Sequence, residues 1–258
     1  MSIAHAASEG GIAIHLSAPV LGHVFGIPLT STTIMVWLTM ILLVMYVVYV
    51  KRTLRVVPSK GQVIIETLIG GAFEYMSEAL ESRELARKFY PLIMTIFVFI
   101  LSLNWLGLLP GVDSIGIYRE VHNEHVLVPF LHPANTDLNI TISLALIAFV
   151  CIELAGIAFL GLFKYGGKFI NFSSPLNFLI GIIELFSELA RLISFSFRLF
   201  GNIFAGKTLI VIAMFFVPFI LPVPLLAFEM FVGFIQAFIF AVLTLFFIKL
   251  AIADPHTH

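Results

Sequence analysis

Residues 174–217 form an apolar stretch that contains five charged side chains. They are Glu184, Glu188, Arg191, Arg198 and Lys207. A carboxyl group can take up and release a proton, whereas an arginine stays charged because its pKa lies above about 12. Within a lipid bilayer each such charge costs at least about 2.5–3.5 kcal/mol. Charges retained at that cost favour a site that handles protons or other ions.

One face of a helix would carry most of these side chains. At about 100° per residue, five polar side chains fall within about 80° of arc, with two serines at its edges. The five are Glu184, Glu188, Arg191, Arg198 and Asn202, and the serines are Ser187 and Ser194. Arg198 has no carboxylate within one turn of its own helix, so it must face protein or water and meet a carboxylate from elsewhere. Lys207 lies off this face and is expected to extend toward water.

A second polar stripe is predicted on the last apolar segment, residues 225–250. Glu229 and Gln236 are seven residues apart and therefore share a face, with Gly233 between them. This stripe is suited to dock against the face that carries Arg198. The structural alternative is that such charges only pair and hold helices together, as Glu188 and Arg191 can at positions i and i+3.

The composition places the whole chain in a membrane. Of 258 residues, 60% are hydrophobic and 11% are charged, and the mean hydropathy is +1.08. In ordinary globular chains, roughly 45–50% of the residues are hydrophobic and about 25% are charged. The single cysteine, Cys151, excludes a disulfide scaffold, and a net charge of −1 without a basic run argues against nucleic-acid binding. The eight histidines lie almost entirely in the termini and loops, so no metal site is expected.

The gaps between charges predict an all-α polytopic membrane protein that forms a single domain over residues 1–258. Five membrane helices are expected at residues 31–50, 90–109, 138–160, 174–217 and 225–250. An amphipathic helix at residues 60–82 is expected to lie on the membrane surface, because glutamates alternate there with apolar side chains. Residues 1–30 are expected to precede the first span, and residues 111–136 to form a polar loop.

The fourth span is unusually long. Ser174 and Pro175 are a favourable helix start, and no proline follows until Pro218. A continuous helix of about 43 residues would be roughly 64 Å long. Hydropathy favours a break near Gly201, which would make two spans.

The distribution of lysine and arginine decides between one and two crossings. Ten basic residues can be placed on the cytoplasmic side, which leaves only Arg119 in an outer loop. They are Lys51, Arg52, Arg55, Lys60, Arg83, Arg87, Lys88, Lys164, Lys168 and Lys249. The N-terminus is then periplasmic and the C-terminus cytoplasmic. Residues 174–217 must cross an odd number of times, which favours one long inclined helix that pairs with the last helix as a hairpin.

Three motifs make the sequence recognisable. Residues 196–206, SFRLFGNIFAG, closely resemble the signature of subunit a of F-type ATP synthases. Residues 133–141, PANTDLNIT, are similar to the loop before that family's fourth helix, and residues 236–244, QAFIFAVLT, to its last helix. The resemblance extends from about residue 20 to residue 253.

The resemblance implies a non-catalytic, proton-translocating stator subunit with two offset half-channels. Its implied partners are a rotating ring of c subunits, the b subunits of the peripheral stalk, the remaining F0F1 subunits and membrane lipid. Protons are the transported ion. No nucleotide site is expected, because nothing resembles a Walker motif. No cofactor is expected either. A bacterial inner membrane is favoured, because an extension with His5, His15 and His23 precedes the first span.

The family's functional residues carry over to matching positions. The resemblance implies that Arg198 is the essential arginine facing the ring and that Gln236 is its neighbour on the last helix. Asn202 and Glu229 would line the outer half-channel and Glu184 the cytoplasmic one. The remaining candidates are Glu188, Arg191 and Ser194 on the polar face, and Asp137 and Asn139 in the loop motif.

One departure from the family pattern concerns Lys207 and Glu229. Many bacterial members carry an acidic residue at the first position and a histidine at the second, so the carboxylate has moved to the other helix here. A single carboxylate on either helix can serve one proton path.

The rival functions are a secondary transporter and an antiporter-like proton-conducting subunit. Transporter folds usually show internal repeats and broken helices, and neither is evident in the sequence.

Overall fold

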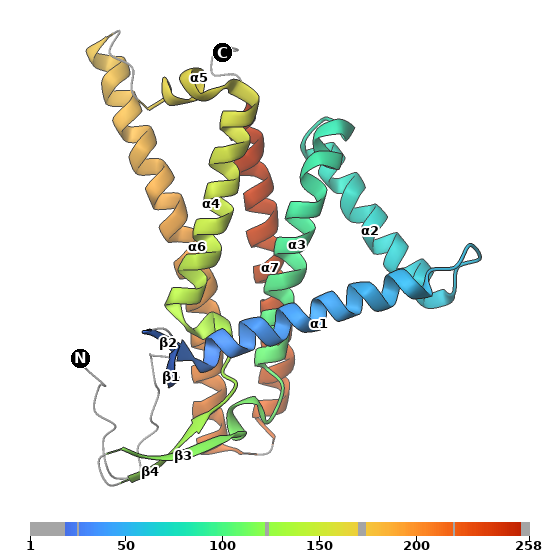
Figure 1. The fold of residues 1–258 in the computed structure, drawn as a ribbon, viewed down its shortest axis with the longest axis vertical. Coiled ribbons are helices and arrows are strands. Elements are labelled where there is room, and N and C mark those ends of the chain that lie inside the picture. Colours follow the sequence, from blue (N-terminus) through green and yellow to red (C-terminus); the bar gives the residue numbers. More distant parts are fainter. Residues whose placement is uncertain (1–18, 25, 122–123, 170–173, 219, 254–258) are drawn as a thin grey trace. The chain divides into compact units, whose positions relative to one another are not determined.

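The computed structural model describes residues 19–24, 26–121, 124–169, 174–218 and 220–253 (Figure 1). Its α-helices are α1 (Ser31–Thr53), α2 (Lys60–Ala79), α3 (Arg83–Gly107), α4 (Leu138–Leu160), α5 (Leu162–Gly166), α6 (Pro175–Phe216) and α7 (Pro222–Ile252). Five of them, α1, α3, α4, α6 and α7, are long and apolar enough to cross a membrane. The prediction of an all-α polytopic membrane protein is confirmed.

The chain forms two compact units. The first contains Met1–Thr39, Leu101–Ile140 and Arg198–Gln236. The second contains Met40–Ile100, Thr141–Phe197 and Ala237–His258. Each of the five spanning helices contributes residues to both units. A single domain over residues 1–258 stays a prediction, and most of the expected N-terminal segment lies outside the described residues.

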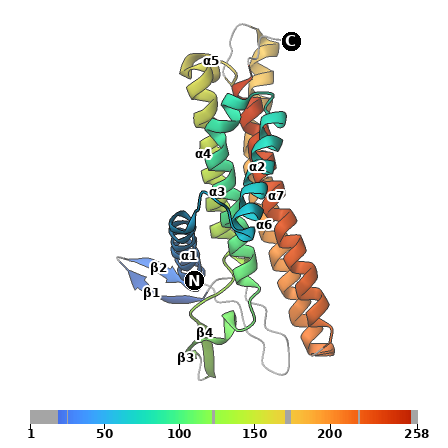
Figure 2. The same cartoon turned by 90° about the vertical axis from the view of Figure 1, so that its right-hand side faces the viewer.

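Two antiparallel hairpins belong to the first unit. Strands β1 (Val20–Val24) and β2 (Ile27–Thr30) pair directly before α1 (Figure 2). Strands β3 (Gly116–Val121) and β4 (Glu124–Pro129) pair within the region expected to be a polar loop. The loop therefore carries regular structure, and it also contains the 3-10 turns η1 (Val112–Ser114) and η2 (Ala134–Thr136).

The turn between α2 and α3 explains a boundary that differs from the prediction. The Ser82 hydroxyl accepts a 3.3 Å hydrogen bond from the Leu85 N–H, which caps a helix beginning at Arg83 rather than at residue 90. Pro91 therefore lies inside α3 instead of in its first turn. Before the turn, α2 ends at Ala79 rather than at residue 82, because Glu81 adopts a left-handed φ of 54°.

Helix α6 is continuous over 42 residues, about 63 Å at 1.5 Å per residue (Figure 1). The break that hydropathy favours near Gly201 is absent, as the lysine and arginine distribution predicted. At its start the Ser174 hydroxyl accepts a 3.3 Å hydrogen bond from the Leu176 N–H, and Pro175 occupies the first helical position.

Helix α7 begins earlier than expected. Pro222 and Pro224 lie in its first turn instead of in the preceding turn. A proline is tolerated there because the first backbone N–H groups of a helix have no intrahelical partner. The helix then continues without interruption to Ile252.

Candidate functional site

In the first unit, polar side chains join the second half of α6 to the first half of α7. The Asn202 side-chain amide donates a 2.7 Å hydrogen bond to Gln236 Oε1. Gln236 is only 2% exposed, and its Nε2 has no hydrogen-bond partner within the part of the chain that the structure describes. A buried amide with an unused donor favours a nearby ordered water. The stripe on α7 thus docks against the α6 face that carries Asn202, as predicted.

Glu229 is buried against the backbone of α6. Its side chain is 4% exposed, and a Cβ built on Gly206 would lie 2.0 Å from its carboxyl group. A larger residue there would require the Glu229 carboxyl to move. Among the described residues, Glu229 Oε1 has no hydrogen-bond partner. A buried carboxyl oxygen that has no cation or donor among the described residues is unlike one held in a structural ion pair.

Arg198 lies one turn before Asn202 on α6, so the two side chains share a face of the helix. It is half-buried, whereas the neighbouring Leu199 is fully buried. The arginine of the motif therefore stands on the polar side of α6 rather than among the apolar side chains of the core.

Helix α3 contributes a residue that the sequence analysis did not select. Asn104 Nδ2 donates a 2.8 Å hydrogen bond to the carbonyl oxygen of Gly233, between the two polar residues of the α7 stripe. Asn104 Oδ1 accepts a 2.6 Å hydrogen bond from Asn135. An asparagine near the end of an apolar span was the available signal, because a buried amide needs partners.

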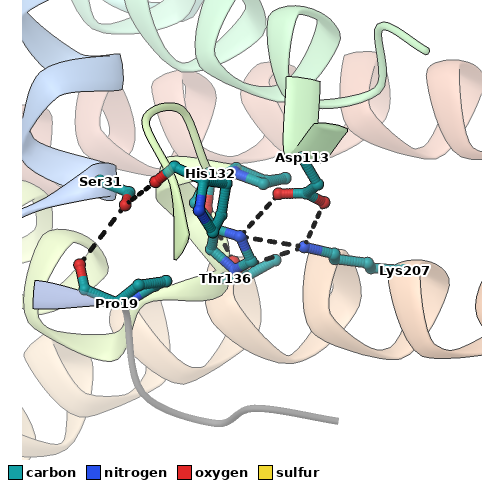
Figure 3. A network of polar contacts seen from close by, with 8 residues as sticks. Pro19, Ser31, Asp113, His132, Thr136 and Lys207 are labelled. Atoms are coloured by element: carbon teal, nitrogen blue, oxygen red, sulfur yellow. Dashed lines mark hydrogen bonds and ion pairs between the residues drawn. The ribbon is translucent and has the colours of Figure 1, made fainter. Parts of the chain in front are cut away.

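Lys207 is the centre of a second network in this unit (Figure 3). Its ammonium donates to Asp113 Oδ2 at 2.9 Å, and His132 Nδ1 lies 2.7 Å from Asp113 Oδ1. The Lys207 Nζ also lies 3.3 Å from His132 Nε2. The prediction that Lys207 simply extends toward water was wrong, because the loop supplies a carboxylate to it.

The pKa of Asp113 reflects these partners. Partial burial alone would raise it, but the hydrogen bonds from His132 and Lys207 and their charges outweigh that effect and lower the pKa below its ordinary value. The carboxylate therefore remains ionised and paired to more acidic pH than a free aspartate.

The loop motif before α4 has well-defined local contacts. Asp137 Oδ1 accepts a 3.0 Å hydrogen bond from the Asn139 N–H at the start of α4, and Asp137 Oδ2 accepts one of 2.9 Å from Thr32. Asp137 is buried, whereas Asn139 is exposed. These contacts make Asp137 a helix cap and a link to α1. A channel role for the two residues stays a prediction.

In the second unit, three of the predicted residues form one ionic cluster. Lys168 Nζ lies 2.6 Å from Glu184 Oε1 and 3.6 Å from Glu188 Oε1. Arg191 Nη1 lies 2.7 Å from Glu188 Oε2, and its guanidinium stacks 3.9 Å from the ring centroid of Phe247. The expected i, i+3 pair is present, but Lys168 from the preceding turn extends it. Ser194 lies exposed on α6.

Glu153 on α4 also has a partner that the sequence did not reveal. The Tyr165 hydroxyl on α5 donates a 3.0 Å hydrogen bond to Glu153 Oε2. The Tyr165 ring packs against Gly156, where an added Cβ would lie 2.3 Å from a ring carbon. Burial raises the pKa of Tyr165, and the hydrogen bond and charge of Glu153 raise it further. The tyrosine therefore stays protonated and keeps donating.

No group of three or more histidine, cysteine, aspartate or glutamate side chains suited to a metal ion occurs among the described residues. The candidate residues thus form two polar groups. The first unit holds Arg198, Asn202, Glu229 and Gln236, and the second holds Glu184, Glu188 and Arg191. Both groups place protonatable or charged side chains within predominantly apolar helices.

Comparison with known proteins gives the family. A family model described as ATP synthase A chain matches residues 33–249. The chain is 30% identical over 234 residues to ATP synthase subunit a of Moorella thermoacetica, covering 91% of this chain and 96% of that protein. It is 34% identical over 223 residues to the Campylobacter concisus protein of the same name, covering 84% and 88%.

A third relative, ATP synthase subunit a of Mycobacterium ulcerans, is 36% identical over 211 residues, covering 81% of this chain and 80% of that protein. The matched region includes all five helices that are long enough to span a membrane. The chain therefore belongs to the ATP synthase subunit a family, a multi-pass membrane component of the F0 sector of the F0F1 complex.

Proposed function

We propose that this chain is the proton-translocating stator subunit of an F-type ATP synthase in a bacterial inner membrane. It would not itself catalyse ATP formation. Its N-terminus would face the periplasm and its C-terminus the cytoplasm. The c-ring and the b subunits of the peripheral stalk would be its direct partners, with protons as the transported ion. Membership of the family supports this role.

The observation that carries the proposal is the hydrogen bond between Asn202 and Gln236 beside the buried carboxyl of Glu229. Glu229 and Gln236 each retain a polar atom without a partner among the described residues. Water that satisfies such atoms can also relay protons along them. These three residues are our candidates for the outer half-channel.

The inner half-channel would use the second group. Glu184 is half-buried and lies against Lys168, and Glu188 is 3% exposed between Lys168 and Arg191. The neighbouring cations hold both carboxylates in position on this face of α6. Ser194 would add a hydroxyl to this polar path.

Arg198 would control the ring carboxyls. A neutral carboxyl crosses lipid at low cost, whereas an ionised one is expensive. A fixed guanidinium stabilises the ionised form only where ring and stator meet, so each arriving carboxyl releases its proton before it passes. The same charge repels cations and keeps the two half-channels separate. One proton moved through 100 mV releases about 2.3 kcal/mol, which biases the direction of rotation.

The test is Arg198→Ala in membranes where assembly of the complex has been verified. We expect loss of ATP-driven acidification in inverted vesicles, together with an increased passive proton leak. Arg87→Ala, at an exposed arginine of α3, is the matched control and should pump normally. Normal pumping by the Arg198→Ala variant would contradict the proposal and leave Arg198 a structural residue.

Partner identity separates the proposal from a transporter. The intact chain should co-purify with a small, glycine-rich, two-helix proteolipid in mild detergent. A transporter or antiporter-like subunit would not require that partner.

A further inference from the structure

The Asp113–His132–Lys207 network is the polar cluster of the first unit that the proposed function does not use (Figure 3). All three side chains come from this unit, but from different elements. Asp113 is in η1, His132 is in the segment between β4 and η2, and Lys207 is on α6. Tertiary structure, not sequence proximity, brings them together.

The network lies next to the site of Glu229. The carboxyl of Glu229 packs on Gly206, and Lys207 is the next residue of α6. Successive residues of a helix point about 100° apart, so Gly206 faces α7 while Lys207 reaches the loop. A lysine therefore occupies the helix position directly after one that we assign to the outer proton path.

The charges of Lys207 and Asp113 cancel within the cluster, because the ammonium and the carboxylate lie 2.9 Å apart. His132 contacts both groups. Its Nδ1 lies 2.7 Å from Asp113 Oδ1, and its two ring nitrogens lie 3.4 Å and 3.3 Å from the Lys207 Nζ. The ammonium therefore has two neighbours, and the Asp113 carboxylate is the one that cancels its charge.

The segment that carries His132 is held by contacts that do not involve Lys207. Ser31 donates a hydrogen bond to the carbonyl oxygen of Pro129, three residues before His132. Immediately after His132, Pro133 packs against Gly107, where an added Cβ would lie 2.9 Å from the proline Cβ. An acceptor held in place in this way loses little conformational entropy on pairing.

The exposures indicate which charges water can screen. The side chains of Asp113 and Lys207 are 44% and 27% exposed, whereas Glu229 is 4% exposed. Water reaches the ion pair but hardly reaches the glutamate. Water therefore screens the Lys207 charge only in part, and the buried Glu229 carboxyl has little water of its own to offset that charge.

We propose that Asp113 is a charge-compensating positioning residue of the outer proton path: it holds the Lys207 ammonium and cancels its charge beside Glu229. This inference rests on the proposed function. Without Asp113, the uncompensated ammonium would repel protons on the outer path. The pairing explains how this chain tolerates a lysine next to Gly206.

The experiment compares Asp113→Asn, Lys207→Gln and the double variant in the assembled complex. The readout is the initial rate of ATP-driven acidification of inverted vesicles, normalised to the amount of complex. We expect D113N to lose pumping on the order of tenfold, because it leaves the Lys207 charge uncompensated. K207Q and the double variant should both stay within about twofold of the unmodified protein, because neither contains the unpaired cation.

The two single variants separate charge compensation from a structural tether. If the pair only fastens the loop to α6, K207Q breaks it as fully as D113N does, and the double variant is no better. A loss of pumping in K207Q as large as that in D113N would overturn the proposal, and so would a double variant that pumps no better than D113N. Normal pumping by D113N would overturn it as well. Glu74→Gln, which alters an exposed carboxylate 3.8 Å from Arg83, is the matched acid-to-amide control.

Two further comparisons keep the test decisive. If D113N reduces the amount of complex, D113N is examined on the K207Q background, where it should have no further effect. An additional tenfold loss there would overturn the proposal.

Arg198→Ala is measured in parallel. Normal pumping by that variant contradicts the proposed function, whereas loss of pumping there with normal pumping by D113N contradicts this inference alone.

Discussion

Asn202 and Gln236 are 34 residues apart, yet the amide of the first donates a 2.7 Å hydrogen bond to the side-chain oxygen of the second. This bond joins the motif on α6 to the polar stripe on α7 within the first unit. The same antiparallel packing places Glu229 against Gly206. Two polar contacts along one helix pair define the candidate outer path.

The hydrogen bond predicts coupling between Asn202 and Gln236. Asn202→Leu or Gln236→Leu should each reduce ATP-driven pumping by roughly fivefold, about the net value of one buried hydrogen bond. The double variant should pump only slightly less than the single variant with the lower pumping rate, because the hydrogen bond can be lost only once. Gln62→Leu, on exposed α2, is the control. Independent, multiplying losses would show that the two side chains act separately.

The contact at Gly206 predicts that an added methyl group displaces the Glu229 carboxyl. In Gly206→Ala the new Cβ would meet the Glu229 carboxyl at about 2.0 Å, so either the carboxyl moves or the helices separate. We expect pumping to fall by more than about tenfold, in line with the usual cost of overpacking. Gly70→Ala, where the added Cβ meets open space, should be neutral.

A second substitution tests the steric explanation for Gly206. Glu229→Asp shortens the side chain by one methylene and should recover part of the pumping lost in Gly206→Ala. Failure to recover any pumping would indicate that the glycine is needed for another reason.

The bond between Tyr165 and Glu153 predicts an effect on stability in the second unit. Tyr165→Phe leaves a carboxyl oxygen without its donor and should lower the melting temperature of the detergent-solubilised chain by about 2–4 °C. Combining it with Glu153→Leu should cancel most of the loss, since both polar partners are then removed. An unchanged melting temperature in Tyr165→Phe would contradict a stabilising role.

The pKa of Tyr165 sets the pH range of that effect. Because burial and Glu153 raise the pKa in the folded protein, the stabilisation is fully present below the ordinary tyrosine value of about 10. The stabilisation is lost only as pH rises through the pKa that Tyr165 has in the folded protein. The shift in melting temperature caused by Tyr165→Phe should therefore be equal at pH 7 and at pH 9. A shift that disappears by pH 9 would contradict this assignment.

The lowered pKa of Asp113 makes the opposite prediction for acidic pH. Its pairing contributes above the ordinary aspartate pKa of about 3.9 and is lost as pH falls through the lower folded value. In a His132→Gln background, which leaves Lys207 as the charged partner of Asp113, the pumping deficit caused by D113N should be the same at pH 8 and at pH 5.5. A deficit that vanishes at pH 5.5 would mean that the carboxylate is already protonated there.

The sequence by itself determined the local features of this protein. Charge gaps located the five spans, and helical periodicity placed Asn202 with Arg198 and Glu229 with Gln236 on their respective faces. The start of α6 at Pro175 also followed from adjacent residues. Such features depend on residues within one or two turns, so the sequence pattern is sufficient to predict them.

Only the tertiary structure decided which distant groups meet. Lys207 and Asp113 are separated by the whole β3–β4 hairpin and α4, and no periodicity relates them. Glu153 and Tyr165 lie on different helices joined by a glycine turn at Gly161. The partner of a buried charge depends on how loops close and helices pack. That is a property of the folded chain, because pairing across such distances requires the intervening segments to be ordered first.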